Sequence, residues 1–202
     1  MADLNTIESL VVSDYTRRPE IPAVTRAAIR TAVLRAHHVD FFPRDLTQYG
    51  LTYIPLSTAI SYDIASLSTI VARLRTIKNI VGTDQATGRP AENFEFRETD
   101  DIYDSDGQRR PSIYTLIGDT LRIYPQAATG SLQLYYYQNP AFVGDIVSSW
   151  IADTYIDEIA AWAAAIVFAR TGFSEQAERI NATNIQPFKE SLLSSHLLGN
   201  VK

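Results

Sequence analysis

Cysteine is absent from this 202-residue chain, so disulfide bonds, thiolate metal sites and cysteine nucleophiles are excluded. Long hydrophobic runs are absent too, because the most apolar window, residues 159–169, is far shorter than the ~20 residues that cross a bilayer. The first ten residues, MADLNTIESL, lack the basic segment and apolar core of a signal peptide. We therefore expect a soluble protein that is made in a cytoplasm and has no membrane partner.

An excess of positive charge is also missing. The chain carries 18 Lys and Arg residues against 23 Asp and Glu residues, a formal charge of −5. No segment is basic enough to wrap nucleic acid by neutralising phosphates, so sequence-specific DNA binding is not expected. The nine glycines are scattered, which leaves no glycine-rich phosphate loop.

Candidates for catalysis or metal binding are few. His37 and His38 are adjacent, so on a helix their side chains point ~100° apart and do not form a joint metal site. The stretch DDIYDSDG (100–107) resembles part of a calcium loop, but isoleucines stand at both end positions that require carboxylates. Asp157 and Glu158 are neighbours on a helix and do not face each other. We predict no catalytic residue, no metal site and no cofactor.

The order of elements predicts an α+β fold, because helices, strands and helices occupy separate parts of the chain. Residues 1–46 read as two helices, DLNTIESLVV and AVTRAAIRTAVLRAHH, and residues 47–140 as a β-rich module. Residues 141–202 read as further helices and a loose tail, LLGNVK. We expect the helices of the two ends to pack as one antiparallel bundle, with the β-rich module inserted between them.

Within the β-rich module, SIYTLIGDTLRIYP predicts a hairpin with a type II′ turn at 118–119, since glycine stands first in a two-residue loop. Together with SLQLYYYQ it predicts three consecutive antiparallel strands. In STIVARLRTIKNIV, Ile77 falls out of the alternation, which predicts a β-bulge.

The C-terminal helices have recognisable ends. Asp153 or Thr154 is expected to cap a helix that runs to Arg170, and Thr171-Gly172 to close it. Ser174 is expected to cap the last helix, and Pro187 to kink or split that helix.

The stretch SLQLYYYQNP (131–140) carries aromatic rings on both faces of a predicted strand. Leu132, Leu134 and Tyr136 share one face, and Tyr135 and Tyr137 lie on the face that is normally wet. Either a neighbouring subunit or the chain's own helices would cover those two rings.

Several short patterns resemble the head-to-tail adaptor proteins of tailed bacteriophages, also called head-completion, connector or tail tubular proteins. In chain order, the patterns are RRPEIP…VDFFPRDL, Pro111 and Tyr114 before the hairpin, LRIYP (121–125), Tyr135 and Tyr136 ending a strand, and Trp150 before an Ala-rich helix. Ser149-Trp150 and Tyr155-Ile156 stand where members of that family usually have Asn-Trp and Tyr-Pro.

The resemblance implies a structural virion protein that is not an enzyme. Its expected place is the neck between capsid portal and tail, after assembly in the host cytoplasm. The expected partners are the portal protein, tail or nozzle proteins, and further copies in a ring, commonly dodecameric. Double-stranded DNA would pass through the lumen without sequence-specific binding. Tyr135 and Tyr137 then become candidate interface residues, a residue type enriched at contact surfaces.

The C-terminal tail is the other candidate contact. Leu197, Leu198 and Val201 are apolar residues in a segment that is expected to be loose, and such residues suit a partner that offers a groove. The sequence leaves two alternative functions open: another phage neck or tail-completion protein, and an enzyme with an unrecognised site.

Overall fold

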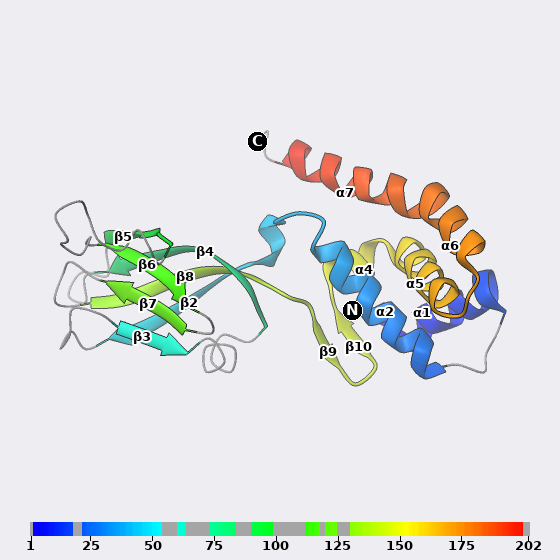
Figure 1. Ribbon diagram of the computed structural model, residues 1–202, viewed down its shortest axis with the longest axis horizontal. Coiled ribbons are helices and arrows are strands. Elements are labelled where there is room, and N and C mark those ends of the chain that lie inside the picture. The colour runs from blue at the N-terminus through cyan, green and yellow to red at the C-terminus, as the bar shows by residue number, and fades with distance from the viewer. Residues whose placement is uncertain are drawn as a thin grey trace. The chain divides into compact units, whose positions relative to one another are not determined.

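The protein is described by a computed structural model, in which residues 2–17, 22–53, 60–63, 73–83, 90–98, 112–117, 120–124 and 130–199 are placed (Figure 1). These residues form both helices and strands, which confirms the α+β prediction. The chain divides into two compact units. We call Met1–Phe42 with Asn139–Lys202 the helical unit, and Pro43–Gln138 the β unit.

The helical unit contains helices from both ends of the chain. Its helical elements are α1 (Leu4–Leu10), the π-helical η1 (Val11–Thr16), α2 (Pro22–His37), α4 (Trp150–Thr154), α5 (Ile156–Arg170), α6 (Ser174–Ile180), the π-helical η4 (Asn181–Ile185) and α7 (Gln186–Gly199). The predicted N-terminal pair is confirmed as α1 and α2, although η1 extends the first helix to Thr16. Asp3 caps α1 by accepting the Asn5 N–H, and Pro22 opens α2, where its missing N–H costs nothing.

The predicted caps of the C-terminal helices were wrong. Ser149, not Asp153 or Thr154, is the capping residue: its hydroxyl accepts the Ala152 N–H at the start of α4. A separate helix, α5, follows Tyr155 without a side-chain cap. Ser174 is the first residue of α6 and does not cap it. The C-terminal end of α5 was predicted correctly, since α5 stops at Arg170 and Gly172 takes a left-handed φ of +85°.

Pro187 is accommodated by a π turn. Proline has no N–H and its ring crowds the carbonyl four residues earlier, so a regular helix cannot pass through it. The π-helical η4 directly precedes it, and Figure 1 shows α6, this turn and α7 as one continuous orange-to-red helix. The backbone of the tail is helical as far as Gly199, and loose packing of this end stays a prediction. Residues 200–202, including Val201, lie outside the described residues.

A small sheet in the helical unit was not predicted. Strands β9 (Ala141–Val143) and β10 (Ile146–Ser148) form a hairpin, and β1 (Ala2–Asp3) pairs with β10 on its other side. The sequence favoured helix directly after Pro140. Gly144 has a φ of +60° and stands first in the two-residue loop, the position that a type II′ turn gives to glycine.

The β unit is a seven-stranded mixed sheet in the order β2-β8-β4-β5-β6-β7-β3. Its strands are β2 (Leu46–Tyr53), β3 (Ile60–Asp63), β4 (Leu74–Thr83), β5 (Pro90–Phe96), β6 (Ile113–Ile117), β7 (Thr120–Tyr124) and β8 (Gly130–Gln138). The predicted hairpin is confirmed by the pairing of Ile117 with Thr120, while turn residues 118–119 lie outside the described residues. The third predicted strand, β8, is not beside β7 but between β2 and β4.

The predicted bulge near Ile77 is confirmed, and β4 contains a second one. Leu74 and Thr76 oppose adjacent residues of β8, as do Ile77 and Asn79, so Arg75 and Lys78 are each an extra residue in the ladder.

The inner face of the sheet buries the predicted alternate residues of β8. The core cluster there is Ile80, Phe94, Tyr114, Leu121, Ile123, Leu132, Leu134 and Tyr136.

Candidate interaction surfaces

Arg26 joins three segments of the helical unit beside a shallow hollow on α1. Its guanidinium donates to Glu8 at 2.9 Å, to Asp145 of the β9–β10 turn at 2.9 Å and to Asn5 at 2.7 Å. The hydrogen bond to Glu8 and the charge of Asp145 raise the pKa of Arg26 above its ordinary value. Arg26 therefore holds α1 and the β9–β10 hairpin against α2.

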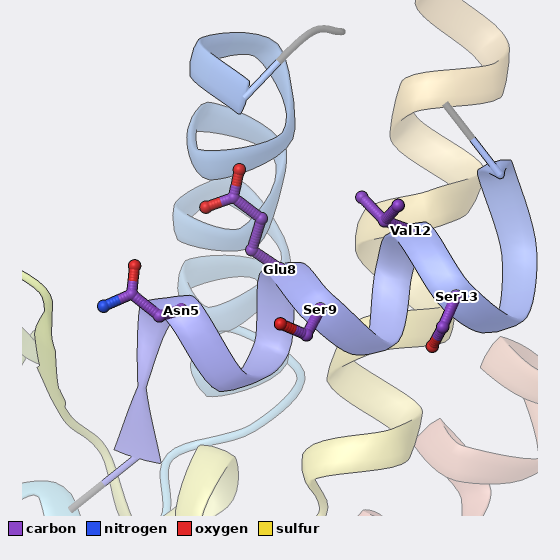
Figure 2. A pocket seen from close by; sticks show the side chains of 5 residues that line it. All are labelled: Asn5, Glu8, Ser9, Val12 and Ser13. Atoms are coloured by element: carbon purple, nitrogen blue, oxygen red, sulfur yellow. The ribbon is translucent and has the colours of Figure 1, made fainter. Parts of the chain in front are cut away.

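The hollow itself has a volume of about 400 Å³ and is open to solvent. Figure 2 shows its lining side chains, all from α1 and η1: Asn5, Glu8, Ser9, Val12 and Ser13. Because they come from one helix face and two of them already bind Arg26, the hollow offers little that could hold a ligand.

His37 belongs to a buried contact that sequence reasoning missed. Its Nε2 lies 2.8 Å from the Ser149 hydroxyl, and both residues are buried. The Trp150 ring meets the rings of His37 and Phe42 edge-on, at centroid distances of 6.1 Å and 5.3 Å. The serine hydroxyl already accepts the Ala152 N–H and is 112 residues from His37 in sequence. This pair ties the end of α2 to the start of α4 and is too enclosed to present a nucleophile to a substrate.

His38 faces outward instead, with its Nε2 3.1 Å from the side-chain oxygen of Asn139. Among the described residues, no three His, Asp or Glu side chains lie close enough together to hold a metal ion. The DDIYDSDG stretch lies outside those residues. No helix in the described part of the chain combines the length and apolar character needed to span a bilayer.

A groove runs between α2, α5 and the α6–α7 helix. It consists of two adjoining hollows of about 610 Å³ and 300 Å³ that share Arg35, Trp162 and Asn181. The lining residues are Arg35, His38, Val39, Trp162, Ala165, Ile166, Ala169, Ala177, Glu178, Asn181, Ile185, Gln186, Lys189, Glu190 and Leu193. The four α5 residues among them recur at i, i+3, i+4 and i+7, so they form one helix face. That face is an apolar floor with charged residues at its rim.

The β9–β10 hairpin carries an apolar knob. Val143 and Ile146 are cross-strand partners, so their side chains lie on the same face, and they are 70% and 48% exposed. Their neighbours Phe142 and Val147 point to the opposite face, where Val147 is completely buried. We call Val143 and Ile146 the hairpin knob.

The predicted interface tyrosines lie on the outer face of β8. Tyr135 and Tyr137 are both half-buried. Tyr135 stands between Gln48 of β2 and Asn79 of β4 in the ladder. The Tyr137 ring lies under two cations of β4: the Arg75 guanidinium carbon is 5.8 Å and the Lys78 Nζ 5.9 Å from its centroid.

The other predicted contact residues belong to the helical unit. Leu197 and Leu198 fall in the last residues of α7, where the backbone is described but the side chains are not. The described candidate residues therefore belong to both units: Tyr135 and Tyr137 lie on the outer face of β8 in the β unit, and Leu197 and Leu198 lie near the end of α7 in the helical unit.

Comparison with known proteins identifies the family of this chain. No curated protein matches the sequence. A family model described as SU10 adaptor protein matches residues 2–192, a range that runs from β1 into α7 and covers nearly the whole chain. The chain therefore belongs to the SU10 adaptor protein family, a family of phage head-to-tail adaptors, and is a structural protein of the virion neck.

Proposed function

We propose that this adaptor forms a ring, with twelve copies as the expected number, between the portal and the tail. The portal protein contacts one side of the ring, tail or nozzle proteins contact the other, and double-stranded DNA passes through the lumen. The protein is not an enzyme and needs no cofactor. The observation that carries this proposal is the family match over residues 2–192.

In this proposal each subunit has the arrangement that the sequence predicts: the helices of residues 1–46 and 141–202 form one antiparallel bundle, and the β-rich residues 47–140 are an insertion in it. In this arrangement the bundle provides the subunit contacts of the ring.

Two unlike surfaces of the helical unit support a ring. A closed ring needs a head-to-tail interface, in which one patch of a subunit meets a different patch of the next. The hairpin knob projects two aliphatic side chains, and the groove offers an apolar floor of Trp162, Ala165 and Ile166. In our proposal the knob of one copy occupies the groove of its neighbour.

The predicted contact residues have places in this scheme as well. Leu197, Leu198 and Val201 at the end of α7 contact the portal or a neighbouring subunit. A subunit contact through Tyr135 and Tyr137 stays a prediction.

Native mass spectrometry of the purified protein tests the ring. A discrete high-order ring is the expected result, as is a monomer that assembles on added portal complexes. A different ring number favours another neck or tail-completion role, and a stable dimer with a bound small molecule would contradict the proposal and favour an enzyme.

Engineered cysteines test the proposed contact, because the natural chain has none to interfere. A Val143→Cys chain is mixed under oxidising conditions with a differently tagged Leu193→Cys chain, whose substituted residue lines the groove. Disulfide-linked heterodimers are expected. The matched control replaces Leu193→Cys by Ser9→Cys, on the outer face of α1, and is expected to give none. Equal cross-linking in both mixtures would remove the knob and groove from the proposal.

A further inference from the structure

The chain departs from regular strand geometry once directly before β4 and twice in the first half of that strand, and each departure falls on a basic residue. Arg73 has a φ of +64°, which is a left-handed conformation that non-glycine residues seldom adopt. Arg75 and Lys78 are the extra residues of the two bulges. Bulges re-aim side chains and gather near functional sites, and positive φ persists only where the surroundings enforce it. The irregular backbone therefore serves the placement of these three side chains.

The two bulge residues meet at one aromatic ring. The Arg75 guanidinium carbon and the Lys78 Nζ lie 5.8 Å and 5.9 Å from the centroid of Tyr137, within the range of cation–π attraction. Arg75 also forms an ion pair with Asp45 at 3.5 Å, and the two side chains are only 7% and 4% exposed. The positive charge of Arg75 is thus paired with the carboxylate of Asp45 in a buried position. Lys78, in contrast, is exposed on the outer face of the sheet.

Exposed cations collect at this end of the sheet. The Lys78 side chain lies over the ring of Tyr137. Tyr137 also pairs with Leu46 at the start of β2. Arg44 lies two residues before Leu46 in the chain. Arg73 lies directly before Leu74, which pairs with Gln138, the residue that follows Tyr137. We call the exposed Arg44, Arg73 and Lys78 the basic edge. It is a local concentration of positive charge in a chain whose formal charge is −5.

We propose that the basic edge contacts the phosphate backbone of the double-stranded DNA that passes through the ring. This inference rests on the proposed function and deepens it, because it assigns a DNA-facing surface to the β unit. Three phosphate contacts per subunit give weak binding that depends on salt and not on sequence. Contacts of that kind guide a moving duplex without holding it, and a ring repeats them in every subunit.

The test uses the full-length protein and a fluorescent 30-base-pair duplex of mixed sequence, with binding followed by anisotropy over a range of salt concentrations. The variants are Arg73→Asn, because asparagine tolerates positive φ, and Lys78→Gln. Each is expected to reduce the slope of log affinity against log salt by about one, the loss of one phosphate contact. Lys78→Arg keeps the charge and is expected to keep the slope.

The matched controls are Arg170→Gln and Arg179→Gln, at exposed positions of the helical unit outside the groove, which are expected to leave the slope unchanged. Circular dichroism and the melting temperature establish that each variant is folded. The inference is overturned if the wild-type chain does not bind the duplex at low salt, or if controls and variants lose affinity equally. It is also overturned if the variants change the oligomer and not DNA binding, which would assign this face to a subunit or an acidic partner.

Failure of the ring is a separate outcome. Native mass spectrometry of the same samples reports assembly directly. Rings with unaltered DNA binding in the variants contradict the basic edge alone, and slope changes in a chain that never assembles contradict the ring alone.

Discussion

Alanine occupies ten buried positions of the helical unit's core, among the described residues, and none in the main core of the β unit. The ten are Ala2, Ala28, Ala32, Ala36, Ala152, Ala160, Ala161, Ala163, Ala164 and Ala165. The β-unit core consists instead of leucine, isoleucine and three aromatic rings, from Phe94, Tyr114 and Tyr136. Small side chains let helices approach closely around α5, whereas the sheet needs large ones to fill the space over its inner face.

The contrast means that opposite substitutions should damage the two units. Removing volume leaves a cavity where large side chains fill the core. Adding volume forces strain where backbones are already close. Both tryptophans, Trp150 and Trp162, lie in the helical unit, so tryptophan fluorescence reports the unfolding of that unit.

The largest effect is expected for Leu134→Ala in the β unit. Leu134 is 1% exposed and packs in the core of the sheet, so the change should lower the free energy of unfolding by about 2–5 kcal/mol. Urea unfolding followed by far-UV circular dichroism measures it. Leu116→Ala, at a site 41% exposed, is the control and should cost no more than about 0.5 kcal/mol. Equal losses in the two variants would show that the sheet does not depend on this core.

Ala163→Leu should have the next largest effect, in the helical unit. Ala163 is completely buried in the middle of α5, and overpacking there should cost about 1–3 kcal/mol. The measurement is the urea midpoint of tryptophan fluorescence. Ala27→Leu on the exposed side of α2 is the control and should leave that midpoint nearly unchanged. An unchanged midpoint in Ala163→Leu would mean that this face of α5 is open and free to receive a neighbouring subunit.

Ser149→Ala should have a smaller effect in the same unit. It removes the cap of α4 and the partner of His37, which together should cost about 1–2 kcal/mol. Ser148→Ala, at the exposed neighbouring position, is the matched control. Fluorescence of the adjacent Trp150 follows both variants, and identical midpoints would contradict a capping role for Ser149.

Local patterns predicted much of the fold because hydrophobic periodicity and glycine act over a few residues. The α2 helix, the end of α5 at Gly172, the β6–β7 hairpin and the bulge beside Ile77 were all predictable in this way. The β9–β10 hairpin carries the same Gly-Asp turn pattern, in FVGDIV, yet it was missed because its strands have three residues each. Strands that short carry too little alternation to be distinguished from a loop.

Contacts between residues far apart in the sequence were the other feature that the sequence did not predict. Neither the His37–Ser149 hydrogen bond nor the Arg26 bridge to Asp145 leaves a signal in sequence, because the partners are more than 100 residues apart. The departures from the family pattern are interpretable from the structure. Ser149 caps α4 as an asparagine would, and Ile156 is the first residue of α5, a position that proline also favours.

The smallest effect on stability is expected at the end of α7, which lies beyond the last described core residue of either unit, Leu192. Truncation after Ser194 removes little more than one helical turn and the final three residues, so the free energy of unfolding should change by less than about 1 kcal/mol. If Leu197, Leu198 and Val201 contact the portal or a neighbour, the same truncation should nevertheless lower the fraction of completed heads.

Truncation after Gly199 is the matched control, because it removes Val201 and keeps both leucines. A defect confined to the longer truncation assigns the contact to Leu197 and Leu198, and a defect in both assigns it to the final residues. Head completion at the wild-type level in both truncated proteins would mean that the tail has no docking role. The separation of the two readouts is what makes the test decisive: a core residue lowers stability and assembly together, whereas a docking residue lowers assembly alone.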